Sequence, residues 1–156
     1  ELPFRFYAVQ DPQINAFSTT GGFVYVNTGL LKAVDNSDQL AGVMAHEIAH
    51  ICNQDLINQL KETQMAQGAA SVVGLDQNAL VGTAYQLAFN LPNSREAEFQ
   101  ADDQGLKYMK RAGYNPRAMP AFLTKLLKQP SPPEFLSNHP ATQDRIQVLK
   151  QKIAEG

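Results

Sequence analysis

Two histidines four residues apart, His46 and His50, lie within a stretch whose apolar residues recur at helical spacing. The apolar positions of that stretch are Leu40, Val43, Met44, Ile48 and Ile51. This periodicity predicts an amphipathic helix from Ser37 to Leu56 that docks one face on a sheet. Asn36 followed by Gln39 has the spacing of a capping box and is expected to start the helix.

The histidine pair forms the sequence His46-Glu47-Ile48-Ala49-His50, or H-E-x-x-H. Residues four apart on a helix project side by side, so both imidazoles can bind one Zn²⁺ at about 2.0–2.1 Å. Glu47 then lies near the open coordination position, where it can act as general base toward an attacking water. The chain's own His and Glu frequencies give on the order of 0.003 accidental matches to this pattern.

The first thirty residues have strand composition. Three segments separated by turn signals are expected to be strands: Phe4 to Val9, Ile14 to Ser18 and Phe23 to Asn27. Asn93 or Ser94 is expected to cap a helix that runs to about Ala112, with Gly113 as its stop signal. Further helices are expected from Asn115-Pro116 and from His139-Pro140. The sequence therefore predicts one α+β domain over residues 1–156, mostly helical with a small N-terminal sheet.

Composition excludes several classes of partner. The 156 residues are 44% apolar and 18% charged, with a net charge of −2, so neither nucleic-acid binding nor a polybasic membrane patch is expected. No run is long and apolar enough for a membrane-spanning helix. The single cysteine, Cys52, points away from the histidines and is expected in the core. Because the chain begins at Glu1, an upstream segment is expected to have been removed.

A third zinc ligand is needed, because two protein ligands make a weak site. Carboxylates near the start of the helix predicted from Ser94 are the candidates, and the residues alone do not favour Glu98 over Glu96. Arg95-x-x-Glu98-x-x-Ala101-Asp102, downstream of H-E-x-x-H, resembles the signature of the HtpX-like zinc metallopeptidases, relatives of the CAAX prenyl endopeptidase in the gluzincin group. Segments 15–17, 22–26 and 137–140 also resemble that family.

The resemblance implies a zincin-like fold with one Zn²⁺ per chain and Glu98 as the third ligand. It also implies that Asp102 orients a ligating histidine. His139 is then expected beside the zinc, where it either stabilises the oxyanion or occupies the open position and holds the enzyme latent. The alternative for His139 is the N-cap of the last helix. Arg145 is expected to be a second electrostatic stabiliser, or else a surface arginine.

The expected activity is that of a zinc metalloendopeptidase in protein quality control, located in the periplasm or at the bacterial envelope membrane. A polypeptide substrate would lie in extended form along an edge strand near residues 15–17, which borders the cleft. The alternative is a non-catalytic, chaperone-like assembly module with structural zinc. The Ala/Gly-rich stretch 65–89 is too short for membrane-spanning helices and forms either a mobile flap or core helices. The sequence does not indicate an oligomeric state.

Overall fold

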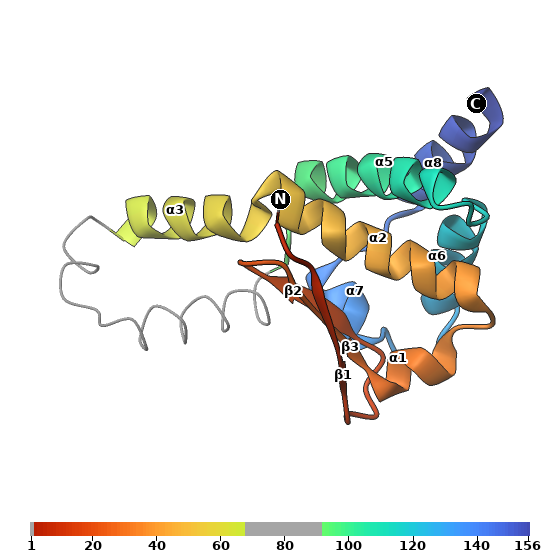
Figure 1. Ribbon diagram of the computed structural model, residues 1–156, viewed down its shortest axis with the longest axis horizontal. Coiled ribbons are helices and arrows are strands. Elements are labelled where there is room, and N and C mark those ends of the chain that lie inside the picture. The colour runs from red at the N-terminus through yellow and green to blue at the C-terminus, as the bar shows by residue number, and fades with distance from the viewer. Residues whose placement is uncertain (1, 68–91) are drawn as a thin grey trace.

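The computed structural model describes residues 2–67 and 92–156, which form a small sheet covered by helices (Figure 1). The strands are β1 (Arg5–Val9), β2 (Ala16–Thr19) and β3 (Phe23–Asn27). The helices are α1 (Thr28–Ala33), α2 (Ser37–Asn53), α3 (Asp55–Gln67), α5 (Arg95–Arg111), α6 (Ala118–Leu127), α7 (Glu134–Asn138) and α8 (Gln143–Glu155). The α+β class with mostly helical content is confirmed. The flap or helices expected over residues 65–89 lie almost wholly outside the described residues.

The sheet has the strand order β1-β3-β2. β1 pairs parallel to β3 with Arg5 opposite Phe23, and β2 pairs antiparallel to β3 with Ala16 opposite Val26. Gly21 and Gly22 supply the left-handed backbone angles of the turn between β2 and β3, with φ of 86° and 89°. The three predicted strands are confirmed, and β2 is an edge strand as expected.

Helix α2 lies between the sheet and α5 (Figure 1). The Asn36 side chain accepts a hydrogen bond from the Gln39 backbone N–H, which confirms the predicted start of the helix. A Cβ at Gly105 of α5 would lie only 3.4 Å from the His46 backbone nitrogen. Glycine at this position therefore lets α5 pack closely against the H-E-x-x-H helix.

The end of α2 differs from the prediction. The helix stops at Asn53, three residues before Leu56, and Gln54 adopts a left-handed conformation with φ 58°. The Gln54 N–H bonds the carbonyls of His50 and Ile51, which closes the last turn. Helix α3 then starts at Asp55 in a new direction, so two helices replace the single predicted one.

The C-terminal half packs against α2 through α5 and α6, and α8 packs on those two helices. Ser94 caps α5, and Gly113 follows it with φ 81°, as the sequence predicts. The predicted start of α8 is wrong, because Thr142, not His139, is its N-cap. His139 instead follows the last residue of the short helix α7.

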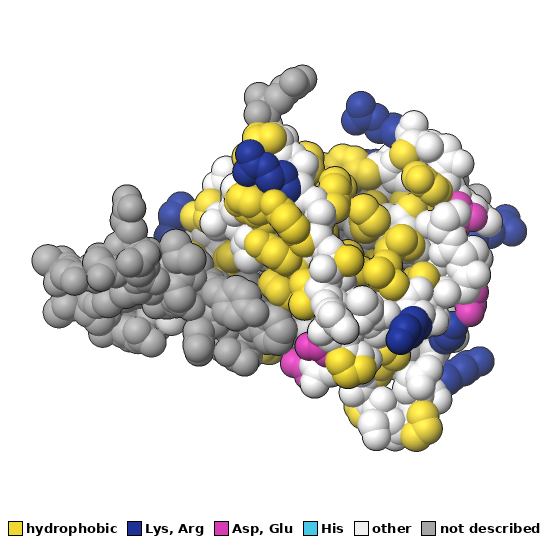
Figure 2. Space-filling view, turned by 60° about the horizontal axis from the view of Figure 1, so that its bottom comes forward, with side chains coloured by type: hydrophobic (Ala, Val, Ile, Leu, Met, Phe, Trp, Pro, Cys, Tyr) yellow, Lys and Arg dark blue, Asp and Glu magenta, His cyan; other side chains and the backbone are white. Residues whose placement is uncertain are grey.

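Cys52 of α2 and the aromatic residues of β1 lie at the surface. Cys52 is exposed, so its predicted place in the core is wrong. Its position on the helix shows only that it faces away from the histidines, not how far neighbouring elements cover it. Along β1, Phe6 and Tyr7 are 47% and 46% exposed. Figure 2 shows apolar side chains gathered on one face of the molecule. No described helix has the length and apolarity to cross a membrane.

Candidate metal centre

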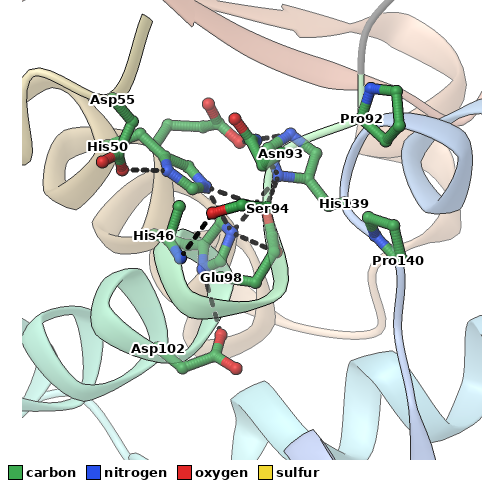
Figure 3. Close-up of polar contacts among 12 residues, drawn as sticks. His46, His50, Asp55, Pro92, Asn93, Ser94, Glu98, Asp102, His139 and Pro140 are labelled. Atoms are coloured by element: carbon green, nitrogen blue, oxygen red, sulfur yellow. Dashed lines mark hydrogen bonds and ion pairs between the residues drawn. The ribbon is translucent and has the colours of Figure 1, made fainter. Parts of the chain in front are cut away.

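Four buried side chains converge between α2, α5 and the segment after α7: His46, His50, Glu98 and His139 (Figure 3). One potential ligand atom from each lies within 4.8 Å of the others. The Nε2 atoms of His46 and His50 are 3.0 Å apart. Glu98 Oε2 lies 3.2 Å from His46 Nε2, and Glu98 Oε1 lies 3.2 Å from His50 Nε2. The cluster thus unites residues that are far apart in the sequence.

The outer nitrogen of each helix histidine faces a carboxylate. His50 Nδ1 lies 2.7 Å from Asp55 Oδ2. His46 Nδ1 lies 3.1 Å from Asp102 Oδ1, close in distance but not well directed for a hydrogen bond. A carboxylate only accepts, so these contacts favour the tautomers with a proton on Nδ1. In those tautomers both Nε2 lone pairs point at each other and at Glu98.

This donor set fits a metal ion. Four electron-rich atoms so close together need a positive charge among them. Bonds of about 2.0–2.1 Å in a tetrahedral site place neighbouring ligand atoms about 3.3 Å apart. The separations of 3.0 Å and 3.2 Å among His46, His50 and Glu98 are close to that value.

The pKa values of the same groups also indicate a need for positive charge. Burial alone lowers the pKa of His50, but the bonds to Asp55 and Glu98 outweigh it and raise that pKa to about 10. Burial likewise raises the pKa of Glu98, yet His139 and His46 hold it well below its usual range. In the protein without metal, protons on His46 and His50 supply the charge that an ion would otherwise provide, since the pKa of each is raised.

Glu47 is buried at 1% exposure, one residue after His46 on α2. Its Oε1 atom lies 3.2 Å from His139 Nε2. Glu47, His50 and His139 all line a cavity of about 160 Å³. The carboxylate is therefore at the cavity wall beside the cluster, where a general base would act.

His139 belongs to this cluster and not to the start of α8. Its Nδ1 atom lies 3.0 Å from Glu98 Oε1 and 3.3 Å from His46 Nε2. The imidazole stacks on Phe135 with ring centroids 4.6 Å apart, and Asn93 Nδ2 lies 3.4 Å from Nδ1. These neighbours hold the ring with one nitrogen toward Glu98 and the other toward Glu47.

Arg145 is 1% exposed, so the alternative of a surface arginine is wrong. Its Nε and Nη2 donate to Asp102 at 2.7 Å and 2.8 Å, and Nη1 lies 2.6 Å from Glu98 Oε2. Nη1 also donates to the Pro140 carbonyl at 2.9 Å. Burial raises the pKa of Asp102, but the bonds from Arg145 lower it below its usual value. The guanidinium thus holds two carboxylates and does not line the cavity beside Glu47.

The structure brings Glu98, not Glu96, to the cluster. Glu98 is 1% exposed, whereas Glu96 is exposed and accepts a hydrogen bond from Gln100. Arg95, three residues before Glu98 on α5, pairs with Asp144 at 2.6 Å and not with Glu98.

Sequence reasoning missed Asp55 and Asn93 as neighbours of the cluster. Asp55 was placed inside a continuous helix, where five residues of separation turn it away from His50. The break at Gln54 is what brings it back. A carboxylate just beyond H-E-x-x-H was the only local signal for this contact. Asn93 was expected only as a helix cap.

A comparison with protein families matches residues 1–153 to "Peptidase family M48". This chain belongs to family M48. The "Beta-barrel assembly-enhancing protease" of Escherichia coli (strain K12) is 34% identical over 168 aligned positions, which cover 94% of this chain and 34% of that protein. "Metalloendopeptidase OMA1, mitochondrial" of Danio rerio is 31% identical over 173 positions, covering 99% and 36%. The chain spans about a third of the length of these relatives.

Membership of family M48 confirms the resemblance to HtpX-like metallopeptidases and the predicted enzyme class, a metallopeptidase. A peptidase acts on peptide substrates, which agrees with the polypeptide expected from the motifs. The family also implies a metal cofactor, and the buried His and Glu cluster is the place where the described residues could hold it.

Proposed function

We propose that this M48 domain is a zinc metalloendopeptidase in which His46, His50 and Glu98 hold Zn²⁺ and Glu47 is the general base. The convergence of two imidazole nitrogens and a carboxylate oxygen, all buried beside Glu47, is the observation that supports it. Two nitrogen ligands and one oxygen ligand suit zinc with one position open, the arrangement of catalytic zinc sites. When bound, the metal supplies Lewis acidity at the substrate carbonyl and the attacking water.

The protein's own groups handle the proton. Glu47 takes a proton from the water as its oxygen attacks the carbonyl carbon, and delivers it to the amine nitrogen as the C–N bond breaks. Asp55 and Asp102 keep the two helix histidines oriented. Arg145 holds Asp102 and Glu98 in place as a positioning residue. The extended substrate is expected along the free edge of β2, where it would pair with backbone groups that do not bond β3.

The test is hydrolysis of denatured casein by the zinc-loaded chain. Glu47→Gln should lower turnover by at least about 100-fold, because the amide cannot accept the proton. Zinc content, measured in the same samples, should not change, since Glu47 is not a proposed ligand. Equal hydrolysis by the variant and the unmodified chain would contradict the assignment of Glu47.

A latent state is a second proposal for the same site. His139 Nδ1 is as close to Glu98 as the helix histidines are, at 3.0 Å, which suits a ligand at the open position better than a group that waits for an oxyanion. Turnover on casein should then be higher in His139→Ala than in the unmodified chain. Complete loss of turnover in His139→Ala would support the alternative role in oxyanion stabilisation.

The cellular setting is proposed from the relatives. A bacterial relative is named as a beta-barrel assembly-enhancing protease, which suggests protein quality control at the bacterial envelope. The competing proposal is an assembly module whose zinc is structural. That proposal would be supported if the zinc-loaded chain left diverse peptides intact while Glu47→Gln kept full biological function. We also propose that residues 1–156 form a single domain.

A further inference from the structure

Strand β1 is an edge strand that the described helices leave uncovered. The sheet order β1-β3-β2 places it at the edge opposite β2, and helix α2 packs against β2 and β3. Among the described elements, β1 packs extensively only against β3. Phe4, Phe6 and Tyr7, in and just before β1, are 36%, 47% and 46% exposed. Phe6 and Tyr7 point to opposite faces of the sheet, so both faces of β1 are apolar and open.

The outer edge of β1 also presents backbone groups that no described strand pairs. The Arg5 N–H donates to the Gly22 carbonyl, as a residue that faces β3 does in the parallel ladder. Backbone groups alternate between the two edges of a strand, so those of Phe6 and Ala8 point to the free edge. Segment 4–9 has Arg5 as its one charge and contains no proline, although charges and prolines usually keep an edge strand from pairing. The edge can therefore accept another strand.

We propose that the free edge of β1 binds the β1 of a second copy of this chain, in antiparallel pairing about a twofold axis at Tyr7. A strand that pairs with its own copy about a twofold axis must run antiparallel to it. Phe6 then exchanges backbone hydrogen bonds with Ala8 of the second copy, and Ala8 with Phe6 of the second copy, about four bonds in all. The two three-stranded sheets become one continuous sheet with β2 at each end.

The side chains on both faces of the sheet support this register. On one face, the rings of Phe17 and Tyr25 stack with centroids 4.9 Å apart, and those of Tyr25 and Tyr7 stack at 5.4 Å. This row of rings ends at the open edge, where Tyr7 of the second copy would continue it. On the other face, Phe6 would lie opposite the small Ala8 of the second copy, so each large side chain meets a small one.

The charge on β1 does not oppose the pairing. The guanidinium of Arg5 lies 5.3 Å from the centroid of the Phe23 ring in its own chain. In the proposed register, Arg5 lies opposite Val9 of the second copy. The two arginines are then about 14 Å apart along the strands, beyond the Debye length of roughly 8 Å at physiological salt. An apolar edge whose single cation lies away from the axis is therefore compatible with a copy of itself.

The exposed area predicts a weak, reversible dimer. Each of Phe4, Phe6 and Tyr7 exposes about 50–120 Å², given about 150–250 Å² for a whole aromatic residue. With the strand backbone, two copies would bury about 600–900 Å², the size of a transient contact, for which we expect a Kd of about 10–100 µM. A lipid surface fits this edge less well, because the outward N–H and C=O groups would have no partners in hydrocarbon.

Sedimentation velocity of the unmodified chain between about 1 and 300 µM tests the proposal. The sedimentation coefficient should rise with concentration as the dimer forms. Phe6→Lys should raise the Kd at least about tenfold, because it removes an apolar contact and places a charge at the edge. Tyr114→Lys is the matched control, since Tyr114 is 42% exposed and lies outside β1, and it should leave the Kd unchanged.

A chain that is monomeric at every concentration would overturn the proposal, and so would a dimer with the same Kd in Phe6→Lys. If Phe6→Lys does not fold, Ala8→Pro serves in its place. Proline removes the outward N–H of Ala8 without removing a bond to β3, so this variant should also raise the Kd at least about tenfold.

Disulfide trapping tests the register of the pairing. In a Cys52→Ser background, Tyr7→Cys places two thiols at the twofold axis. The Cα atoms of such a non-hydrogen-bonded pair are about 4.5 Å apart, within disulfide range. Oxidation with copper phenanthroline should give a covalent dimer on a non-reducing gel. Arg5→Cys, on the same face, should stay largely monomeric because its copies lie about 14 Å apart. Equal trapping of both variants would overturn the proposal.

A foreign strand is the competing occupant of this edge. A fluorescein-labelled peptide of four Thr-Val repeats is the probe. If the unmodified chain stays monomeric but binds this peptide, and Phe6→Lys weakens the binding, the edge takes foreign strands and the proposal of a second copy is overturned.

The proposal does not depend on the proposed function. The dimer leaves both β2 edges free, so casein hydrolysis per chain should be the same in Phe6→Lys and in the unmodified chain. A dimer without any hydrolysis would support the pairing of β1 and contradict the peptidase. Hydrolysis by a chain that stays monomeric would leave the peptidase in place and overturn the pairing.

Discussion

At the scale of single residues, the proposed metal centre includes carboxylates that contact the outer nitrogens of its histidines and do not themselves face the cluster. Asp55 and Asp102 each contact the Nδ1 atom of one helix histidine, at 2.7 Å and 3.1 Å. Such partners fix the orientation of a ligating imidazole and raise its basicity. The sequence predicted this role for Asp102 through the family resemblance, and the structure places Asp55 in the equivalent position for His50.

Asp55→Asn should weaken zinc binding by about 10- to 100-fold, because an amide accepts the Nδ1 proton more weakly than a carboxylate does. Competition with a chromophoric chelator measures the Kd. Asp103→Asn is the control, since Asp103 pairs with Lys107 and Lys152 on the surface. Unchanged affinity in Asp55→Asn would show that the contact with His50 does not tune the metal site.

Arg145→Met should lower the free energy of unfolding by about 3–5 kcal/mol at neutral pH, because it leaves Asp102 and Glu98 buried without their cation. Urea denaturation of the metal-free chain measures this. Arg145→Met/Asp102→Leu should cost less than the sum of the two single changes. Strictly additive costs would contradict a shared network.

The ion pair between Arg145 and Asp102 also predicts that the free energy of unfolding depends on pH. Arg145 lowers the pKa of Asp102 in the folded protein below its ordinary value of 3.8. The stabilisation is therefore present above pH 3.8 and is lost as the pH falls through the lower folded value. Urea denaturation across pH 2–7 should show the Arg145→Met deficit shrinking toward the acid end. A deficit independent of pH would mean that packing of the arginine, not its charge, causes it.

At the scale of elements, the junction between α2 and α3 decides the shape of the site. Local patterns predicted one helix through this region because the apolar spacing continues past Asn53. No glycine or proline marks the break, and Gln54 adopts the left-handed conformation that glycine usually supplies. The contact of Asp55 with His50, which local patterns do not contain, accompanies the break.

Substitutions at Gln54 test the strain of this junction. Gln54→Val should lower the free energy of unfolding by about 1–2 kcal/mol, because a β-branched residue adopts the left-handed region poorly. Gln54→Gly should keep or slightly raise it. Thermal denaturation followed by circular dichroism measures both. A Val variant as stable as the unmodified chain would contradict the left-handed conformation at this position.

At the scale of the whole molecule, the metal centre joins α2, α5 and the segment after α7, so the ion is expected to stabilise the folded chain. Bound zinc at about 1,000 times its Kd should raise the free energy of unfolding by about 4 kcal/mol. Scanning calorimetry should show a higher Tm with zinc and a lower one after chelation. Glu47→Gln should keep this shift and His46→Ala should lose most of it, and a shift retained in His46→Ala would place the ion elsewhere.

The sequence by itself determined the three strands, the start of α2 and the end of α5, and which side chains share a face of a helix. The Asn36 cap, the three strands, Gly113 and the side-by-side placement of His46 and His50 follow from local backbone preferences and helical spacing. Such signals involve only residues that are near one another in the chain, so they can be recognised without knowledge of tertiary contacts.

Only the tertiary structure decided which of those faces are covered and what meets there. It selected Glu98 over Glu96, brought Asp55 back to His50, buried Arg145 between two carboxylates and left Cys52 exposed. Each outcome depends on how α2, α3, α5 and α8 pack, through contacts between residues distant in the chain. A helical pattern indicates which side chains share a face. Whether those side chains are buried or paired with a charge depends on which element packs against that face.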